Sequence, residues 1–78
     1  MPRLGKLSGR KVLKILCNKF GFEIRGRRGS HVRISKEVDG RKVGTVIPMH
    51  DELKIGTLKN VLKLAGISEE DFAEYLWV

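Results

Sequence analysis

The sequence is poor in the residues that build disulfides and metal centres. It holds a single cysteine, Cys17, which excludes an internal disulfide and a cysteine-based zinc site. Its two histidines, His31 and His50, do not form an H-E-x-x-H motif, so a metal site would have to rely on carboxylates. The apolar runs are far shorter than the roughly 20 residues that cross a bilayer. We therefore expect no metal, no cofactor and no membrane span.

Motifs of two common enzyme classes are missing as well. Residues 25–30 include glycines but lack the spacing and the following helix of a P-loop. Ser30 and His31 are adjacent on the chain, so on a strand their side chains point to opposite faces and do not form a catalytic triad. Residues 1–6 contain no apolar stretch of a signal peptide. Together with the single cysteine, this favours a cytoplasmic location.

The positive charge is concentrated in the first half of the chain. The net charge is +7 over 78 residues. Residues 1–36 carry eleven Lys and Arg against one acid, Glu23, whereas residues 37–78 carry five against eight acids. A concentrated cationic region binds polyanions, because each cation that neutralises a phosphate releases condensed counterions. This favours nucleic acid as the partner; the alternatives are anionic lipid or a solvated face that only aids solubility.

Two amphipathic helices and a short third helix are predicted. Ser8 caps a helix over about residues 9–19, and Gly21 ends it. Its predicted buried stripe is Leu13, Leu16, Cys17 and Phe20. A second helix spans roughly residues 54–64 and ends at Gly66. Its predicted stripe is Leu58, Val61, Leu62 and Ala65. Ser68 opens a last short helix that runs through Phe72, Tyr75 and Leu76.

Three strands are predicted between the helices. Residues 22–25 alternate with period two, so Phe22 and Ile24 share the apolar face, and residues 31–35 alternate in the same way. Asp39-Gly40 indicates a hairpin, and a third strand over about residues 41–47 ends at Pro48. The side chains on the opposite face are then Glu23, Arg25, Arg27, His31, Arg33 and Ser35.

The expected fold is of the α+β class, in the order α-β-β-β-α with a short C-terminal helix, as a single domain over residues 1–78. Strands joined by hairpins form an antiparallel sheet, and the two apolar helix stripes cover one of its faces. The other face stays open to solvent. Arg25, His31 and Arg33 lie on this open face.

His31 is the residue best suited to catalysis on RNA. Cleavage requires a base that takes the proton from a 2′-hydroxyl group and cations that hold the phosphate. An imidazole is mostly neutral at pH 7 and can accept that proton. The alternative is that His31 is an ordinary exposed strand residue. The groups expected to hold RNA are Arg25, Arg27, Arg28, Arg33, Lys11, Lys14 and the backbone N–H groups of Gly29 and Ser30.

The other polar and aromatic candidates have two interpretations each. His50 assists as an acid or positions substrate, or else it caps or packs at the junction between strand and helix. Cys17 lies on the buried stripe and is a core residue rather than a nucleophile. Tyr75 and Trp77 stack on bases, or else they belong to the core or to a partner contact.

Several segments occur together in a characteristic order. They are Ser8-Gly9-Arg10, Gly21-Phe22, Arg28-Gly29-Ser30-His31, Val46-Ile47-Pro48-Met49-His50, Leu53-Lys54-Ile55-Gly56-Thr57-Leu58 and Leu62-Lys63-Leu64-Ala65-Gly66-Ile67-Ser68. In this order and spacing they resemble the HicA (YcfA-like) toxin family over nearly the whole chain. The resemblance implies a fold like that of double-stranded-RNA-binding domains. It also implies a ribosome-independent mRNA endonuclease with His31 as its catalytic histidine, and a HicB-type antitoxin that covers the active face.

Two other functions are compatible with the same residues. A non-catalytic RNA-binding module would use the same fold and charge to recognise the A-form shape of double-stranded RNA. A protein-interaction adaptor would dock through acidic residues 69–74 and the apolar end at 75–78. The substitution His31→Ala separates a nuclease from a binder, because only the nuclease loses an activity while RNA affinity is kept.

Overall fold

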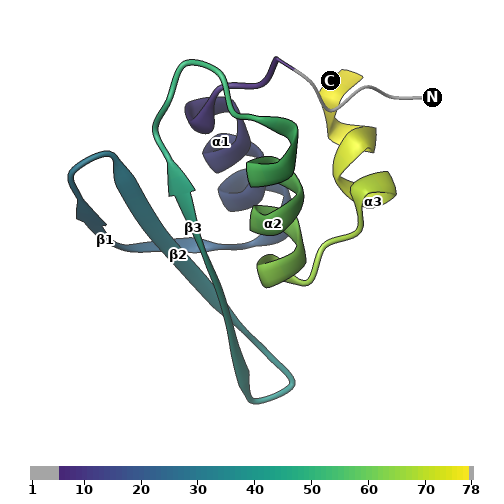
Figure 1. Ribbon diagram of the computed structural model, residues 1–78. Helices are drawn as coiled ribbons and strands as arrows, with labels where there is room; N and C mark the ends of the chain where they lie inside the picture. Colours follow the sequence, from purple (N-terminus) through teal and green to yellow (C-terminus); the bar gives the residue numbers. More distant parts are fainter. Residues whose placement is uncertain (1–5, 78) are drawn as a thin grey trace.

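The computed structural model describes residues 6–77, and its element order confirms the predicted fold class (Figure 1). The elements are α1 (Gly9–Phe20), β1 (Glu23–Arg28), β2 (His31–Val38), β3 (Arg41–Pro48), α2 (Ile55–Ala65), α3 (Glu69–Ala73) and the 3-10 helix η1 (Glu74–Trp77). The expectation about a signal peptide falls mostly on residues 1–5, outside the described range, as does Val78 of the apolar C-terminal end.

Helix α1 begins and ends at the residues that the sequence indicates. The Ser8 hydroxyl accepts a hydrogen bond from the backbone N–H of Lys11 at 3.1 Å, and Gly21 follows the helix in the left-handed conformation. The buried face, however, is rotated by about one residue from the predicted stripe. Its fully buried members are Gly9, Val12, Ile15 and Leu16, and Leu13, Cys17 and Phe20 are only partly buried beside it.

The C-terminal half of the core follows the prediction closely. All four residues of the predicted α2 stripe are buried. The buried Thr45 hydroxyl of β3 donates a hydrogen bond to the Val61 carbonyl of α2 at 3.0 Å, which fixes this helix against the sheet. The Ser68 hydroxyl caps α3, and Phe72 on that helix is completely buried. Within residues 6–77, no helix has the length and apolar character of a membrane span.

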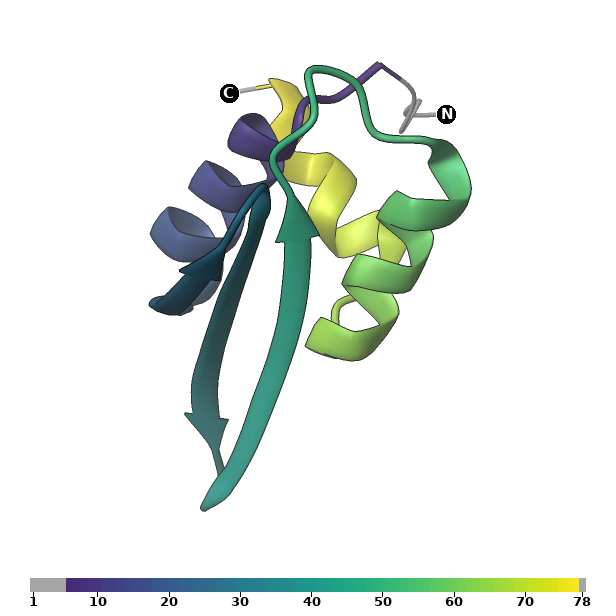
Figure 2. The same ribbon diagram turned by 60° about the vertical axis from the view of Figure 1, so that its left-hand side comes forward.

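The three strands form an antiparallel sheet in the order β1-β2-β3. The turn between β2 and β3 has Asp39 and Gly40 both at positive φ, as two-residue hairpins require. This hairpin extends beyond the helices at the lower end of Figure 2. Val32, Ile34 and Ile47 point from the sheet into the core beneath the helices. The opposite face, called the outer face below, carries His31 and Arg33.

A β-bulge interrupts β1, which the sequence analysis did not foresee. The register pairs Ile24 with Ile34 but Gly26 with Arg33, so Arg25 is an extra residue without a direct partner on β2. The predicted unbroken alternation along β1 is therefore wrong. Ile24 is 58% exposed. It lies on an edge strand, where helices cover the sheet less completely.

After the bulge, the arginines of β1 lie on the opposite faces from those predicted by simple alternation. Arg28 lies opposite His31, and Arg27 lies opposite the buried Val32. Directly opposed residues of antiparallel strands share a face. Arg28, rather than Arg27, therefore belongs to the outer face together with His31.

Ser35 also differs from the expectation of a solvent-exposed residue. Its position on β2 places it on the outer face, yet it is only 3% exposed. The Nε atom of Arg25 in the bulge donates a hydrogen bond to the Ser35 hydroxyl at 2.8 Å. The bulge thus turns an arginine over the middle of the outer face.

Candidate nucleic-acid interface

His31 is the first residue of β2 and its side chain is exposed. The register places it between Arg28 of β1 and Pro48 of β3. The imidazole is therefore not enclosed by the core, and a ligand on the outer face can reach it. In the described chain, Arg28 takes part in no ion pair, so its guanidinium group is available to an anion.

The turn that precedes His31 is held by two bonds. Arg27 donates a hydrogen bond from Nε to the Gly29 carbonyl at 3.1 Å, and the Ser30 carbonyl accepts one from the Met49 N–H at 2.6 Å. Gly29 has a positive φ of 59°, which a residue with a side chain adopts only with strain. Arg27 therefore supports the turn with part of its guanidinium group.

The segment after β3 closes the same end of the molecule. The backbone N–H of Gly9, the first residue of α1, donates to the His50 carbonyl at 2.9 Å. A Cβ atom on Gly9 would collide with the Pro48 carbonyl oxygen, so only glycine allows this approach. Since Pro48 lies opposite His31, both histidines are at one end of the sheet. The His50 side chain is exposed, and its backbone carbonyl accepts the hydrogen bond from Gly9 where the segment after β3 meets α1.

Arg27, Arg28 and Arg33 together line a hollow of about 370 Å³ next to the start of β2. Within residues 6–77, no ion pair involves any of the three. A Cβ atom on Gly26 would lie 2.9 Å from Nη2 of Arg33, which shows that the Arg33 guanidinium extends across β1 above this glycine. The hollow is strongly cationic, and the planar guanidinium groups are suited to phosphate oxygens.

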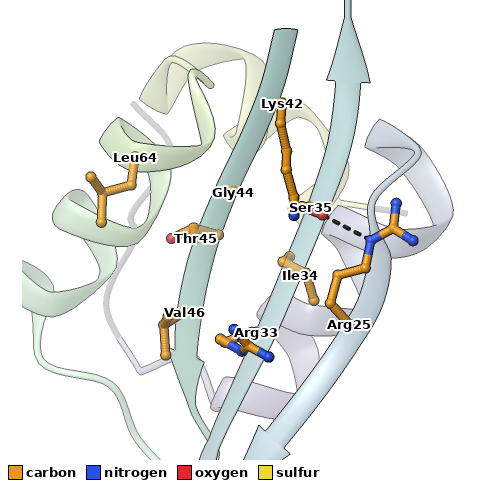
Figure 3. Close-up of a pocket in the computed structure, with 9 residues that line it drawn as sticks. All are labelled: Arg25, Arg33, Ile34, Ser35, Lys42, Gly44, Thr45, Val46 and Leu64. Atoms are coloured by element: carbon orange, nitrogen blue, oxygen red, sulfur yellow. Dashed lines mark hydrogen bonds between the residues drawn. The ribbon is translucent and has the colours of Figure 1, made fainter.

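A second hollow lies further along the outer face (Figure 3). Arg25, Arg33 and Lys42 contribute one cationic side chain from each strand. Figure 3 shows the Lys42 side chain between β2 and β3 with its amino end toward Ser35. Of these residues, Ser35, Lys42 and Gly44 were not singled out as binding residues from the sequence. Gly44 lies opposite Ser35, and a glycine at this position leaves the middle of the outer face without a side chain. This pairing is recognised only once the register between β2 and β3 is known.

Lys11 and Lys14 belong to a different surface. They project from α1 and line a hollow of about 240 Å³ with Asn18, Lys19 and Tyr75, none of which is in the sheet. Tyr75 packs edge-to-face against Phe20, with ring centroids 5.2 Å apart. The predicted RNA-binding residues therefore divide into a group around His31 and a group on α1.

Cys17 and the metal-binding residue types are the next catalytic candidates in the described part of the chain. Burial raises the pKa of the Cys17 thiol, which disfavours the nucleophilic thiolate. Among the described residues, no cluster of three or more His, Cys, Asp or Glu side chains could hold a metal ion.

Comparison with known proteins identifies one family. A family model described as HicA toxin of bacterial toxin-antitoxin matches residues 9–67, which is most of the chain. The match covers α1, the sheet and α2, and so contains the His31 end of the outer face. Neither the curated proteins nor the solved structures include a match.

Proposed function

Because the chain belongs to the HicA toxin family of bacterial toxin-antitoxin systems, we propose that it is an endoribonuclease that cuts mRNA with His31 as general base. The observation that carries the proposal is the exposed imidazole opposite Arg28, beside a hollow lined by three arginines. RNA cleavage requires a base and cations that hold the phosphate, and His31 shares the outer face with Arg28 and Arg33, which make no ion pair in the described chain.

The proposed reaction uses the RNA's own 2′-hydroxyl as nucleophile. His31 takes the hydroxyl proton while the 2′-oxygen attacks the adjacent phosphorus, and the bond from phosphorus to the 5′-oxygen breaks. The 5′-oxygen leaves with a proton, and the other product ends in a 2′,3′-cyclic phosphate. His50 is the candidate donor of that proton, because it lies at the same end of the sheet. Neither step needs a metal ion.

The arginines have different parts in this proposal. Arg28 and Arg33 make no ion pair in the described chain, and they stabilise the charge that develops on the phosphate. Arg25 and Arg27 each use Nε for an internal hydrogen bond, so they contact RNA with their remaining N–H groups. The Gly29 and Ser30 N–H groups bind a phosphate oxygen, and Lys11 and Lys14 hold RNA that extends onto α1.

The family also implies an antitoxin partner. We propose a HicB-type antitoxin that covers the outer face around His31. Such a partner would inhibit cleavage by excluding RNA from the arginine-lined hollow. An acidic contact surface on the antitoxin would complement the unpaired arginines.

The decisive experiment compares the purified chain with His31→Ala on a defined mRNA in EDTA, with the cut ends mapped. We expect 2′,3′-cyclic phosphate ends from the wild-type chain, no cuts from His31→Ala, and nearly equal RNA affinity for both. Lys59→Ala, an exposed substitution on α2, serves as the matched control. Cleavage that stops in EDTA would refute the mechanism. Binding without cleavage by either chain would indicate the non-catalytic RNA-binding module.

A further inference from the structure

The second hollow of the outer face is lined by residues that have no part in the proposed cleavage step, apart from the arginines. Its volume is about 260 Å³, and it is bounded by Arg25, Arg33 and Lys42. Val46 of β3 and Leu64 of α2 are exposed apolar side chains, at 39% and 54%, and both line it, so the hollow reaches the edge of the sheet at β3, beside α2. A surface that combines apolar walls with a cationic rim differs from the arginine-lined hollow beside His31.

The hollow exists because the middle of the outer face has little side-chain cover. Gly44 of β3 lies opposite Ser35 of β2, and the Ser35 hydroxyl is already engaged by Arg25. A Cβ atom on Gly44 would lie 3.2 Å from the Ile34 carbonyl oxygen and 3.4 Å from the Cβ of Ser35. Any side chain larger than that of alanine at position 44 would extend over the outer face and occupy the hollow.

The rim is cationic and largely unneutralised. Arg25 forms a single long contact with Glu23, at 3.8 Å between two exposed side chains. Glu37 lies opposite Lys42, but within residues 6–77 no ion pair joins them. The rim therefore attracts the phosphates on either side of an occupant, while Val46 and Leu64 contact its apolar faces.

We propose that this hollow binds an unstacked nucleobase of single-stranded RNA and thereby selects the position of the cut. A nucleobase has apolar faces and is joined to phosphates, so it matches both the walls and the rim. A phosphate alone would leave the apolar walls unused, and an apolar peptide would leave three cations unused. The proposal rests on the proposed nuclease function and adds the substrate class and a specificity subsite to it.

The distance from His31 indicates which base is bound. Ser35 follows His31 by four residues on β2, which corresponds to about 13 Å along the strand. The occupant is therefore the base of a nucleotide that flanks the cut. A base paired within a duplex is stacked and cannot enter a hollow in a protein surface. Single-stranded RNA is thus the expected substrate.

The test fills the hollow and measures binding and cleavage separately. Gly44→Val adds a side chain over the hollow, and Lys42→Gln removes one rim charge without adding volume. Lys59→Gln is the control for charge, because Lys59 lies on α2 outside the hollow. Thermal unfolding identifies the variants that fold. Affinity is measured with a fluorescent single-stranded oligoribonucleotide, and cut positions are mapped on a long RNA before and after annealing to its complement.

We expect wild-type chain to cut only the unannealed RNA. Gly44→Val should bind the oligoribonucleotide about tenfold more weakly, the scale of one lost base contact, and should change the preferred cut positions. Lys42→Gln should lose more affinity than Lys59→Gln.

Wild-type affinity and cut positions in a folded Gly44→Val variant would overturn the proposal. If Gly44→Val does not fold, equal effects of Lys42→Gln and Lys59→Gln would overturn it. Reduced antitoxin binding with unchanged RNA binding would also overturn it, because the hollow would then be a protein contact. Failure of the nuclease proposal is recognised separately, since the wild-type chain would then bind RNA but leave it uncut.

Discussion

Arg28 and His31 lie directly opposite each other across the turn between β1 and β2, on the face that the helices leave uncovered. The bulge at Arg25 produces this pairing, because one extra residue in β1 exchanges the faces of the arginines that follow it. The placement of Arg28 and His31 on one surface therefore depends on a single irregularity in the backbone.

Arg28 should therefore be more important for cleavage than Arg27, although the two are adjacent. We expect Arg28→Ala to lower kcat about a hundredfold, the usual loss when one charge-stabilising donor is removed. Arg28→Lys should recover only part of this loss, since a lysine lacks the planar fork. Initial cleavage rates measure the effect. Arg41→Ala, at the exposed start of β3, is the control and should cleave normally.

RNA affinity should depend on salt in a way that reports the number of phosphate contacts. For single strands, each contact contributes about −0.7 to the slope of log affinity against log salt concentration. The double variant Arg28→Gln/Arg33→Gln should therefore reduce the magnitude of the slope by about 1.4. A titration of fluorescence anisotropy from low to moderate salt measures it. An unchanged slope would show that neither arginine contacts a phosphate.

Gly9→Ala and Gly56→Ala form a pair with opposite expected effects on stability. At Gly9 the new methyl group would collide with the Pro48 carbonyl, so we expect a loss of at least about 2 kcal/mol. At Gly56 the methyl group meets no heavy atom within 4 Å, and alanine favours a helix, so we expect a gain of up to about 1 kcal/mol. Urea unfolding of both variants measures the difference. Equal stabilities would mean that α1 does not approach β3 as described.

Cys17 should make the folded chain less stable in alkaline solution. Burial raises the pKa of its thiol in the folded state. The unfolded chain therefore loses the thiol proton at lower pH than the folded chain. Stability is unaffected below the unfolded pKa and falls as pH rises from there through the folded pKa. The free energies of unfolding of wild type and Cys17→Ala should therefore change differently with pH only above the thiol pKa of the unfolded chain. Parallel pH profiles would contradict the assignment.

Local signals were sufficient to predict most of the fold. Ser8 and Gly21 mark the ends of α1, and Asp39-Gly40 marks a hairpin, because caps and tight turns depend on a few neighbouring residues. The exposed position of His31 followed from alternation within one strand, and the structure confirms it. These features require no knowledge of the partner strands.

Features that depend on distant residues were missed. The buried face of α1 is centred on Val12 because Gly9, one turn earlier, packs against Pro48 of β3. The bulge at Arg25 becomes visible only when β1 is aligned with β2, and the hollow above Gly44 requires the register of all three strands. Periodicity in the sequence predicts a regular helix or strand. The buried face of α1, the bulge and the hollow depend instead on contacts between different elements.

The backbone bonds at the His31 end have a consequence for synthesis. Ser30, Gly9 and Leu7 are bonded to Met49, His50 and Leu53 respectively. The turn that precedes His31 therefore lacks its hydrogen bond to Met49 until the ribosome has released the chain beyond that residue. A growing polypeptide contains all the arginines around His31 before that point, but it lacks the backbone hydrogen bonds to Met49, His50 and Leu53. The backbone arrangement around His31 is thus complete only when residues from both halves of the chain are present.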